Sequence, residues 1–123
     1  MTNESLALKR MLANGPLTGF PTRRSDQELL LRLAAARFEP ERRYSEAEVN
    51  ETLRTWLATF CAPFGIDHVS LRRYLVDARL LGRDTSGSSY RLLRKSSLAP
   101  LDLAQILAGI QRERAERKRQ HAP

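Results

Sequence analysis

Apolar residues recur at helical spacing along most of this chain and define five segments. In the third segment Val49, Leu53 and Trp56 follow one another at steps of four and three residues, so they share one face of a helix. Glycine and proline residues lie between the segments and interrupt helix formation there. The pattern predicts helices over residues 3–13, 25–36, 45–60, 67–80 and 100–120.

Three of these helices are preceded by residues suited to capping their free N–H groups. Ser45 and Glu48 have the three-residue spacing of a capping box, and Ser25 and Glu28 repeat that spacing before the preceding helix. Asp67 is the expected N-cap of the fourth helix. These residues predict where the three central helices begin.

The stretch LLGRDTSGSSYRLL, residues 80–93, predicts two short strands around an Asp-Thr-Ser-Gly turn in which Gly87 takes a positive φ. The stretch FEPERRYS, residues 38–45, is expected to be extended because Pro40 stops the preceding helix. Helix, short strand, helix, helix and hairpin is the order of a winged helix-turn-helix. We therefore predict a mainly α fold with a small β-hairpin wing, of the α+β class.

The sequence divides into three parts on this interpretation. Residues 1–19 form an N-terminal helical extension and linker, residues 20–95 form the winged-helix domain, and residues 96–123 form a C-terminal amphipathic helix with a basic tail. A chain of 123 residues has room for one such domain.

Positive charge is unevenly distributed along the chain, whose net charge is +7. Residues 61–95, which hold the predicted third helix and the wing, contain seven basic and three acidic residues, a balance of +4. Residues 25–60, which hold the two supporting helices, contain five basic and seven acidic residues, a balance of −2. A polarised distribution of this kind favours a polyanionic partner such as double-stranded DNA.

Few residues are available for catalysis or for a metal. The single Cys61 excludes an intramolecular disulfide, and His68 and His121 are too few to complete a usual zinc site. A Cys61–His68 dyad is the one nucleophilic arrangement left open, against the plainer interpretation that Cys61 is a small core residue. We expect no enzyme activity and no cofactor.

No apolar run approaches the about 20 residues that span a bilayer, and Lys9 and Arg10 interrupt the apolar residues of the N-terminal segment. The expected location is cytoplasmic, without membrane contact.

Three features resemble a known family: RFEPERRYSEAEVN at residues 37–50, the helix HVSLRRYLVDARLLGR at residues 68–83, and Tyr90 after the wing turn. On these motifs residues 20–93 resemble the bacterial domain of unknown function 2087 family. The resemblance implies a winged-helix domain. It also implies a part in transcriptional regulation, because some members are fused behind arsenic-repressor-type helix-turn-helix domains. A domain joined to a separate DNA reader equally suits a sensor or dimerisation role, so both roles stay open.

The predicted third helix carries apolar residues on two sides, which leaves only narrow polar strips between them. Leu71, Tyr74, Leu75, Ala78 and Leu81 share one side, and Val69, Val76 and Leu80 lie on the opposite side. A recognition helix would present a broad polar face to the base edges. The arginines of this helix are therefore more readily explained as structural or solvated, and backbone contact is favoured over base reading.

Cations of the wing and of the segment before the second helix are the other candidates for phosphate contact. Arg23 and Arg24 are expected to form a basic arm or a solvated linker. The candidate nucleic-acid-binding residues are Arg83, Arg91, Arg94, Lys95, Ser70, Arg72, Arg73, Arg79, Arg23 and Arg24.

The C-terminal helix has an apolar stripe that needs a partner surface, formed by Leu103, Ile106, Leu107 and Ile110. An N-terminal cluster around Leu8 and Leu12 raises the same need. Packing on the same chain and pairing with a second copy are both open, and a homodimer or another regulatory protein is the expected partner.

Two functions follow. The first is a DNA-associated winged helix, a bacterial transcription regulator or an accessory to one. The second is a non-catalytic interaction or dimerisation module, supported by the second apolar side of the third helix.

Overall fold

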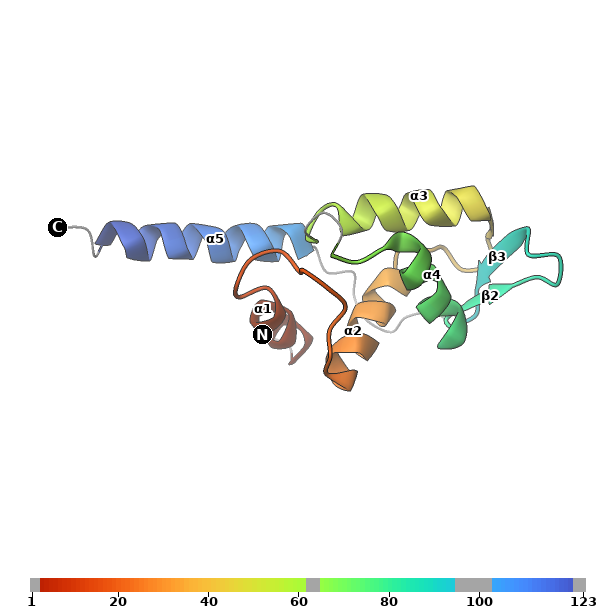
Figure 1. The fold of residues 1–123 in the computed structure, drawn as a ribbon, viewed down its shortest axis with the longest axis horizontal. Helices are drawn as coiled ribbons and strands as arrows, with labels where there is room; N and C mark the ends of the chain where they lie inside the picture. Colours follow the sequence, from red (N-terminus) through yellow and green to blue (C-terminus); the bar gives the residue numbers. More distant parts are fainter. Residues whose placement is uncertain (1–2, 62–64, 95–102, 121–123) are drawn as a thin grey trace.

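The structure, a computed structural model, describes residues 3–61, 65–94 and 103–120 (Figure 1). Within these residues the elements follow the predicted order. They are α1 (Asn3–Met11), α2 (Arg24–Ala35), β1 (Arg43–Ser45), α3 (Glu46–Leu57), α4 (His68–Asp77), β2 (Leu81–Arg83), β3 (Ser89–Leu92) and α5 (Leu103–Gln120).

The three strands form one antiparallel sheet in the order β1-β3-β2. β2 and β3 make the hairpin, and β1 lies along the other side of β3, so that Tyr44 is paired with Tyr90. This strand order, together with α2, α3 and α4, is the arrangement of a winged helix. The prediction of an α+β fold with a β-hairpin wing is confirmed. Figure 1 shows the hairpin at one end of the molecule and α5 extending from the other.

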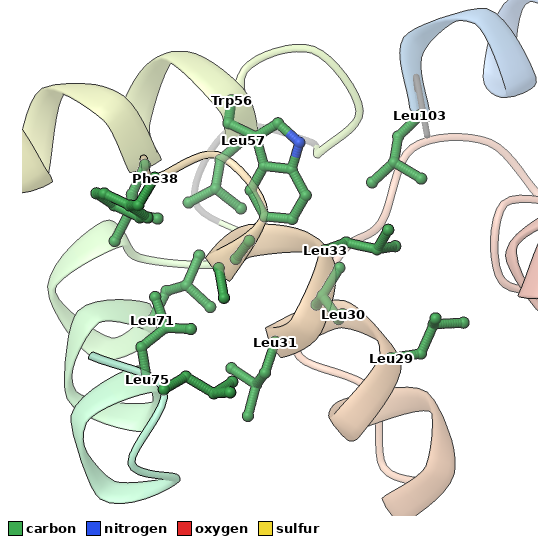
Figure 2. Packing of buried hydrophobic residues seen from close by; sticks show 14 of the residues in the cluster. Leu29, Leu30, Leu31, Leu33, Phe38, Trp56, Leu57, Leu71, Leu75 and Leu103 are labelled. Carbon is green, nitrogen blue, oxygen red and sulfur yellow. The ribbon is translucent and has the colours of Figure 1, made fainter. Parts of the chain in front are cut away.

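Helix α2 lies at the centre of the core and is buried on more than one face. The predicted stripe included Leu29, Leu30 and Leu33, and all three are buried. Leu31, Ala34 and Ala35 are buried as well, because α4 covers one side of α2 and α1 another. Figure 2 shows the leucines of α2 gathered with Leu71 and Leu75 of α4 and with Trp56 and Leu57 of α3. Among the described residues the buried set is entirely hydrophobic.

The predicted helix starts are correct for α3 and α4 and wrong for α2. Ser45 Oγ accepts from the Glu48 N–H at 3.1 Å, and Glu48 Oε1 accepts from the Ser45 N–H at 3.0 Å, which completes the capping box. Asp67 Oδ1 accepts from the Val69 N–H at 3.1 Å. Helix α2 instead begins at Arg24 after an extended Arg23 without a side-chain cap, so Ser25 already lies inside the helix.

Helix α4 ends earlier than expected, at Asp77 rather than near Leu80. The Leu80 N–H donates to the Leu75 carbonyl at 3.0 Å and the Arg79 N–H donates to the Val76 carbonyl at 3.0 Å. This pair of bonds is a Schellman motif, and it places Arg79 in the left-handed region with φ 60°. Leu80 is consequently turned into the core, where it is 8% exposed.

The terminal extensions pack on each other and on the winged-helix region. Helix α1 contacts both α5 and α2. Leu8 and Leu12 of α1 join Leu103 and Leu107 of α5 in the hydrophobic core, and the Arg10 guanidinium pairs with the Asp26 carboxylate of α2 at 2.5 Å. The rear half of α5, residues 111–119, is exposed throughout. Among the described residues, no helix is both long enough and apolar enough to span a bilayer.

Candidate nucleic-acid interface

Arg72 of α4 faces the interior of the domain. Its Nη1 donates to Asn50 Oδ1 at 2.5 Å, and its Nη2 lies 3.1 Å from Glu46 Oε1. Its guanidinium carbon lies 5.8 Å from the centre of the Tyr90 ring, and only 14% of the side chain is exposed. Arg72 therefore joins α4 to α3 and β3, and its surroundings favour a structural role over the predicted contact with nucleic acid.

The other candidates on or just after α4 are Ser70, which is engaged within the chain, and Arg73 and Arg79, which are exposed. The Ser70 hydroxyl donates to Asp67 Oδ2 at 3.3 Å, so Ser70 belongs to the helix cap. Arg73 and Arg79 are exposed and form no ion pair with another described residue. Tyr74 was expected on the same side of the helix as Leu71, but it is 40% exposed. Its ring packs on the outside of the linker residue Phe20, with ring centres 4.6 Å apart. Helix α4 and the turn after it thus offer two arginines to solvent, Arg73 and Arg79, rather than a broad polar face.

The candidate basic arm before α2 remains at the surface. Arg23 and Arg24 are exposed, and Arg24 Nε lies 3.4 Å from Glu28 Oε1 one helical turn later. Arg94 follows β3 and is also exposed. Lys95 lies outside the residues that the structure describes.

The outward face of the sheet brings together two arginines that are far apart in the sequence. Arg43 of β1 is directly opposite Arg91 of β3, and Arg91 is opposite Gly82 of β2 on its other side. Tyr44 and Tyr90 alternate with the two arginines and are buried, so both arginines point away from the core. Directly opposed side chains on one sheet face have Cβ atoms about 5 Å apart. Neither arginine forms an ion pair with another described residue.

A cleft of about 450 Å³ lies over this face. Arg43 and Arg91 line it, and Arg83 reaches it from the end of β2. The Arg83 guanidinium lies over Gly87, whose φ of 75° forms the predicted turn, and a Cβ at Gly87 would collide with it. Leu93 borders the cleft and occupies the space above Gly82 that a side chain there would fill. We call this cleft, which is lined by Arg43, Arg83 and Arg91, the arginine cleft.

Among the described residues that line the cleft, Asp84 is the one carboxylate, and its oxygens accept hydrogen bonds from the wing turn. Ser89 Oγ donates to Oδ2 at 2.9 Å, and the Ser88 N–H and Ser86 Oγ donate to Oδ1 at 2.9 and 3.0 Å. These bonds, that from the Ser89 hydroxyl foremost, hold the pKa of Asp84 well below its usual range. Asp84 therefore fixes the turn and forms no ion pair with the arginines of the cleft.

Arg43 is the residue that sequence reasoning missed. Arg42 and Arg43 are adjacent, but Arg42 is engaged with Glu39, Glu48 and the Tyr44 ring, whereas Arg43 points outward. The alternation around Tyr44 in RRYS would have placed Arg43 on the exposed face. Its position beside Arg91 depends on the register of β1 with β3.

This arrangement is suited to binding oxyanions. Guanidinium groups donate several hydrogen bonds in a planar fork that fits phosphate oxygens, and they stay charged at all relevant pH values. Arg73 of α4 and Arg79 just after it, both exposed, add charge without adding base-reading groups.

Cys61 packs against the linker before α2. Its Sγ donates to the Leu17 carbonyl at 3.3 Å, where Leu17 and Cys61 form an isolated parallel bridge. Burial raises the pKa of the Cys61 thiol, which disfavours the thiolate that a nucleophile requires. Within the described part of the chain, no three His, Cys, Asp or Glu residues are grouped as metal ligands would be.

The predicted interface of α5 is partly used within the chain. Leu103 is 2% exposed and Leu107 is 7% exposed, while Ile106 and Ile110 are half-buried against the same core. Leu80 is buried and Val76 packs against the core, so the second apolar side of α4 is also largely covered. A homodimer stays a prediction, and less apolar surface is free for it than the sequence suggested.

Comparison with protein families gives a match over more than half of the chain. The model of a family described as an uncharacterized protein conserved in bacteria, DUF2087, matches residues 16–92. The matched span runs from the linker to the last residue of β3, so it includes Arg43, Arg83 and Arg91 and leaves out α1 and α5. No curated protein and no solved structure matches the chain.

Proposed function

The chain belongs to the bacterial family DUF2087, and we propose that its winged-helix region binds the phosphate backbone of duplex DNA. In this role it acts without catalysis, as a transcription regulator or an accessory to one. The observation that carries the proposal is the group of three exposed arginines from three strands, Arg43, Arg83 and Arg91, which line one cleft and have no carboxylate partners among the described residues.

The positions of the cations support contact with the backbone rather than base reading. Of the arginines on α4 and at its end, Arg72 is held internally, and Arg73 and Arg79 remain exposed without a surrounding set of amide side chains. Recognition of bases depends on such donors and acceptors in the major groove. Affinity for the backbone depends on the number of cations that displace condensed counterions. The wing and sheet contribute more of these cations than α4 does.

Fluorescence anisotropy with a labelled DNA duplex, measured over a range of salt concentrations, tests the proposal. We expect the logarithm of the binding constant to fall linearly with the logarithm of salt, and duplexes of unrelated sequence to bind equally well. Replacing Arg83 or Arg91 by Ala is expected to reduce the slope by about 1 for each arginine.

Arg37→Ala is the matched control, because Arg37 is an exposed arginine after α2, outside the wing and the sheet. Absence of binding at low salt, or the same slope in all variants, contradicts direct contact through the wing.

A further inference from the structure

The arginine cleft combines an excess of positive charge with a bounded shape. Of the described residues that line it, three are arginines and one is an aspartate, a net charge of +2. Arg43 and Arg91 enter the space of about 450 Å³ from neighbouring strands. Arg83, the last residue of β2, is paired with Tyr90 and also lines the space, with its guanidinium over Gly87. Leu93 closes part of its edge with an apolar surface.

The opposition of Arg43 and Arg91 is unfavourable in the free protein. Like charges directly opposite on one sheet face repel. The nearest carboxylate in the cleft, Asp84, directs its oxygens to the donors of Ser86, Ser88 and Ser89. The neighbouring Arg42, by contrast, is compensated by Glu39 and Glu48. The chain therefore provides counterions for Arg42, just before β1, and none, within the described residues, for Arg43 of β1.

We propose that the arginine cleft holds one phosphate group, bound between the Arg43 and Arg91 guanidinium groups and completed by Arg83. The proposed DNA binding supplies one source of that phosphate, an internucleotide diester, and the inference rests on it to that extent. A phosphorylated small molecule would offer the same chemistry as a monoester. The site recognises the phosphate group in either case, and a monoester carries more negative charge than a diester.

Thermal unfolding in the absence of DNA tests this site directly. Sodium phosphate is added up to about 20 mM at constant ionic strength, because a few charge-assisted contacts on an open surface support millimolar affinity. We expect a saturable rise in Tm, of about 5 °C at ten times the dissociation constant. Sodium chloride at equal ionic strength is expected to give no such rise.

Variants of Arg43 and Arg91 are expected to differ from the wild type in Tm in one direction without phosphate and in the other direction with it. Arg43→Gln and Arg91→Gln each remove the repulsion, so without phosphate both are expected to unfold at the wild-type Tm or slightly above it. Both are expected to bind phosphate about tenfold more weakly. Arg37→Gln, which removes the same charge elsewhere on the surface, is expected to keep the full response to phosphate. Isothermal titration calorimetry on the wild-type chain gives the affinity independently of unfolding.

Two ligands distinguish the sources. Equal binding of dimethyl phosphate and inorganic phosphate supports a diester in the cleft, and clear preference for inorganic phosphate supports a monoester. A response to phosphate that is absent, or unchanged in both Arg43→Gln and Arg91→Gln, overturns the site. Because no DNA is present, DNA binding that survives such a result leaves the proposed function standing. If the chain binds phosphate but fails to bind DNA, the phosphate site stands and only a DNA diester is excluded as its ligand.

Discussion

Arg72 and Arg73 are adjacent on α4, and we expect their replacement by Ala to affect the protein in different ways. Arg72 donates to Asn50, pairs with Glu46 and lies over the Tyr90 ring, with 14% of its side chain exposed. Arg73 is exposed and has no such partners within the described part of the chain. The pair is a matched comparison, since one residue type is removed from two consecutive positions of one helix.

The cost of Arg72→Ala is the sum of three contacts. A hydrogen bond made by a charged donor contributes about 1.5–3 kcal/mol. The pair with Glu46, which is half-exposed, contributes about 0.5 kcal/mol, and the contact with the Tyr90 ring contributes about 0.5–1 kcal/mol. We therefore expect a loss of about 3 kcal/mol from the free energy of unfolding. Arg73→Ala is expected to stay within about 0.5 kcal/mol of the wild type.

Urea unfolding followed by the fluorescence of Trp56, the single tryptophan, measures both variants. Arg72→Lys is a further test: it keeps the charge but loses the planar fork, so it is expected to recover part of the stability. Equal stability of Arg72→Ala and Arg73→Ala would refute the structural role of Arg72. If Arg72→Ala kept full stability and reduced the salt dependence of DNA binding, the residue would instead be a phosphate contact.

Two further predictions concern the end of α4 and the wing turn. Arg79→Gly is expected to raise the free energy of unfolding by about 1 kcal/mol, because Arg79 has φ 60° and glycine adopts that conformation without strain. Arg73→Gly, inside the helix, is expected to lower the free energy of unfolding by about 1 kcal/mol. The midpoints of urea unfolding measure both changes, and a loss of stability in both variants would contradict the reasoning. Asp84 has a lowered pKa when folded, so its stabilisation is present above the unfolded pKa of about 3.9 and is lost as the pH falls through the lower folded value. In Asp84→Asn the urea midpoint is expected to fall less steeply than in the wild type between about pH 5 and pH 2, and Ser89→Ala is expected to make this fall shallower too. The same fall of the midpoint in both variants as in the wild type would contradict the reasoning.

The candidate site was only partly predictable from the sequence. Arg83 and Arg91 were found because the turn around Gly87 is a local motif that places both on a wing. Arg43 was missed because its role depends on β1 pairing with β3, across about forty residues of chain. Arg72 was included because a helical wheel cannot tell that Asn50 and Glu46 of α3 lie within reach.

The sequence by itself determined the features that depend on a few neighbouring residues. The capping box of Ser45 and Glu48, the cap at Asp67 and the turn at Gly87 each form from groups within five positions of one another, so their patterns in the chain are sufficient. The order of helices and strands follows from the same local rules.

Tertiary structure decided which surfaces are covered. It buried α2 on more than one face, joined Leu8 and Leu12 to Leu103 and Leu107, and turned one arginine of α4 inward while leaving the next in solvent. It also set two like charges side by side on the sheet. These outcomes depend on packing and strand register between segments far apart in the chain, where burial of apolar area outweighs the local pattern of any one helix.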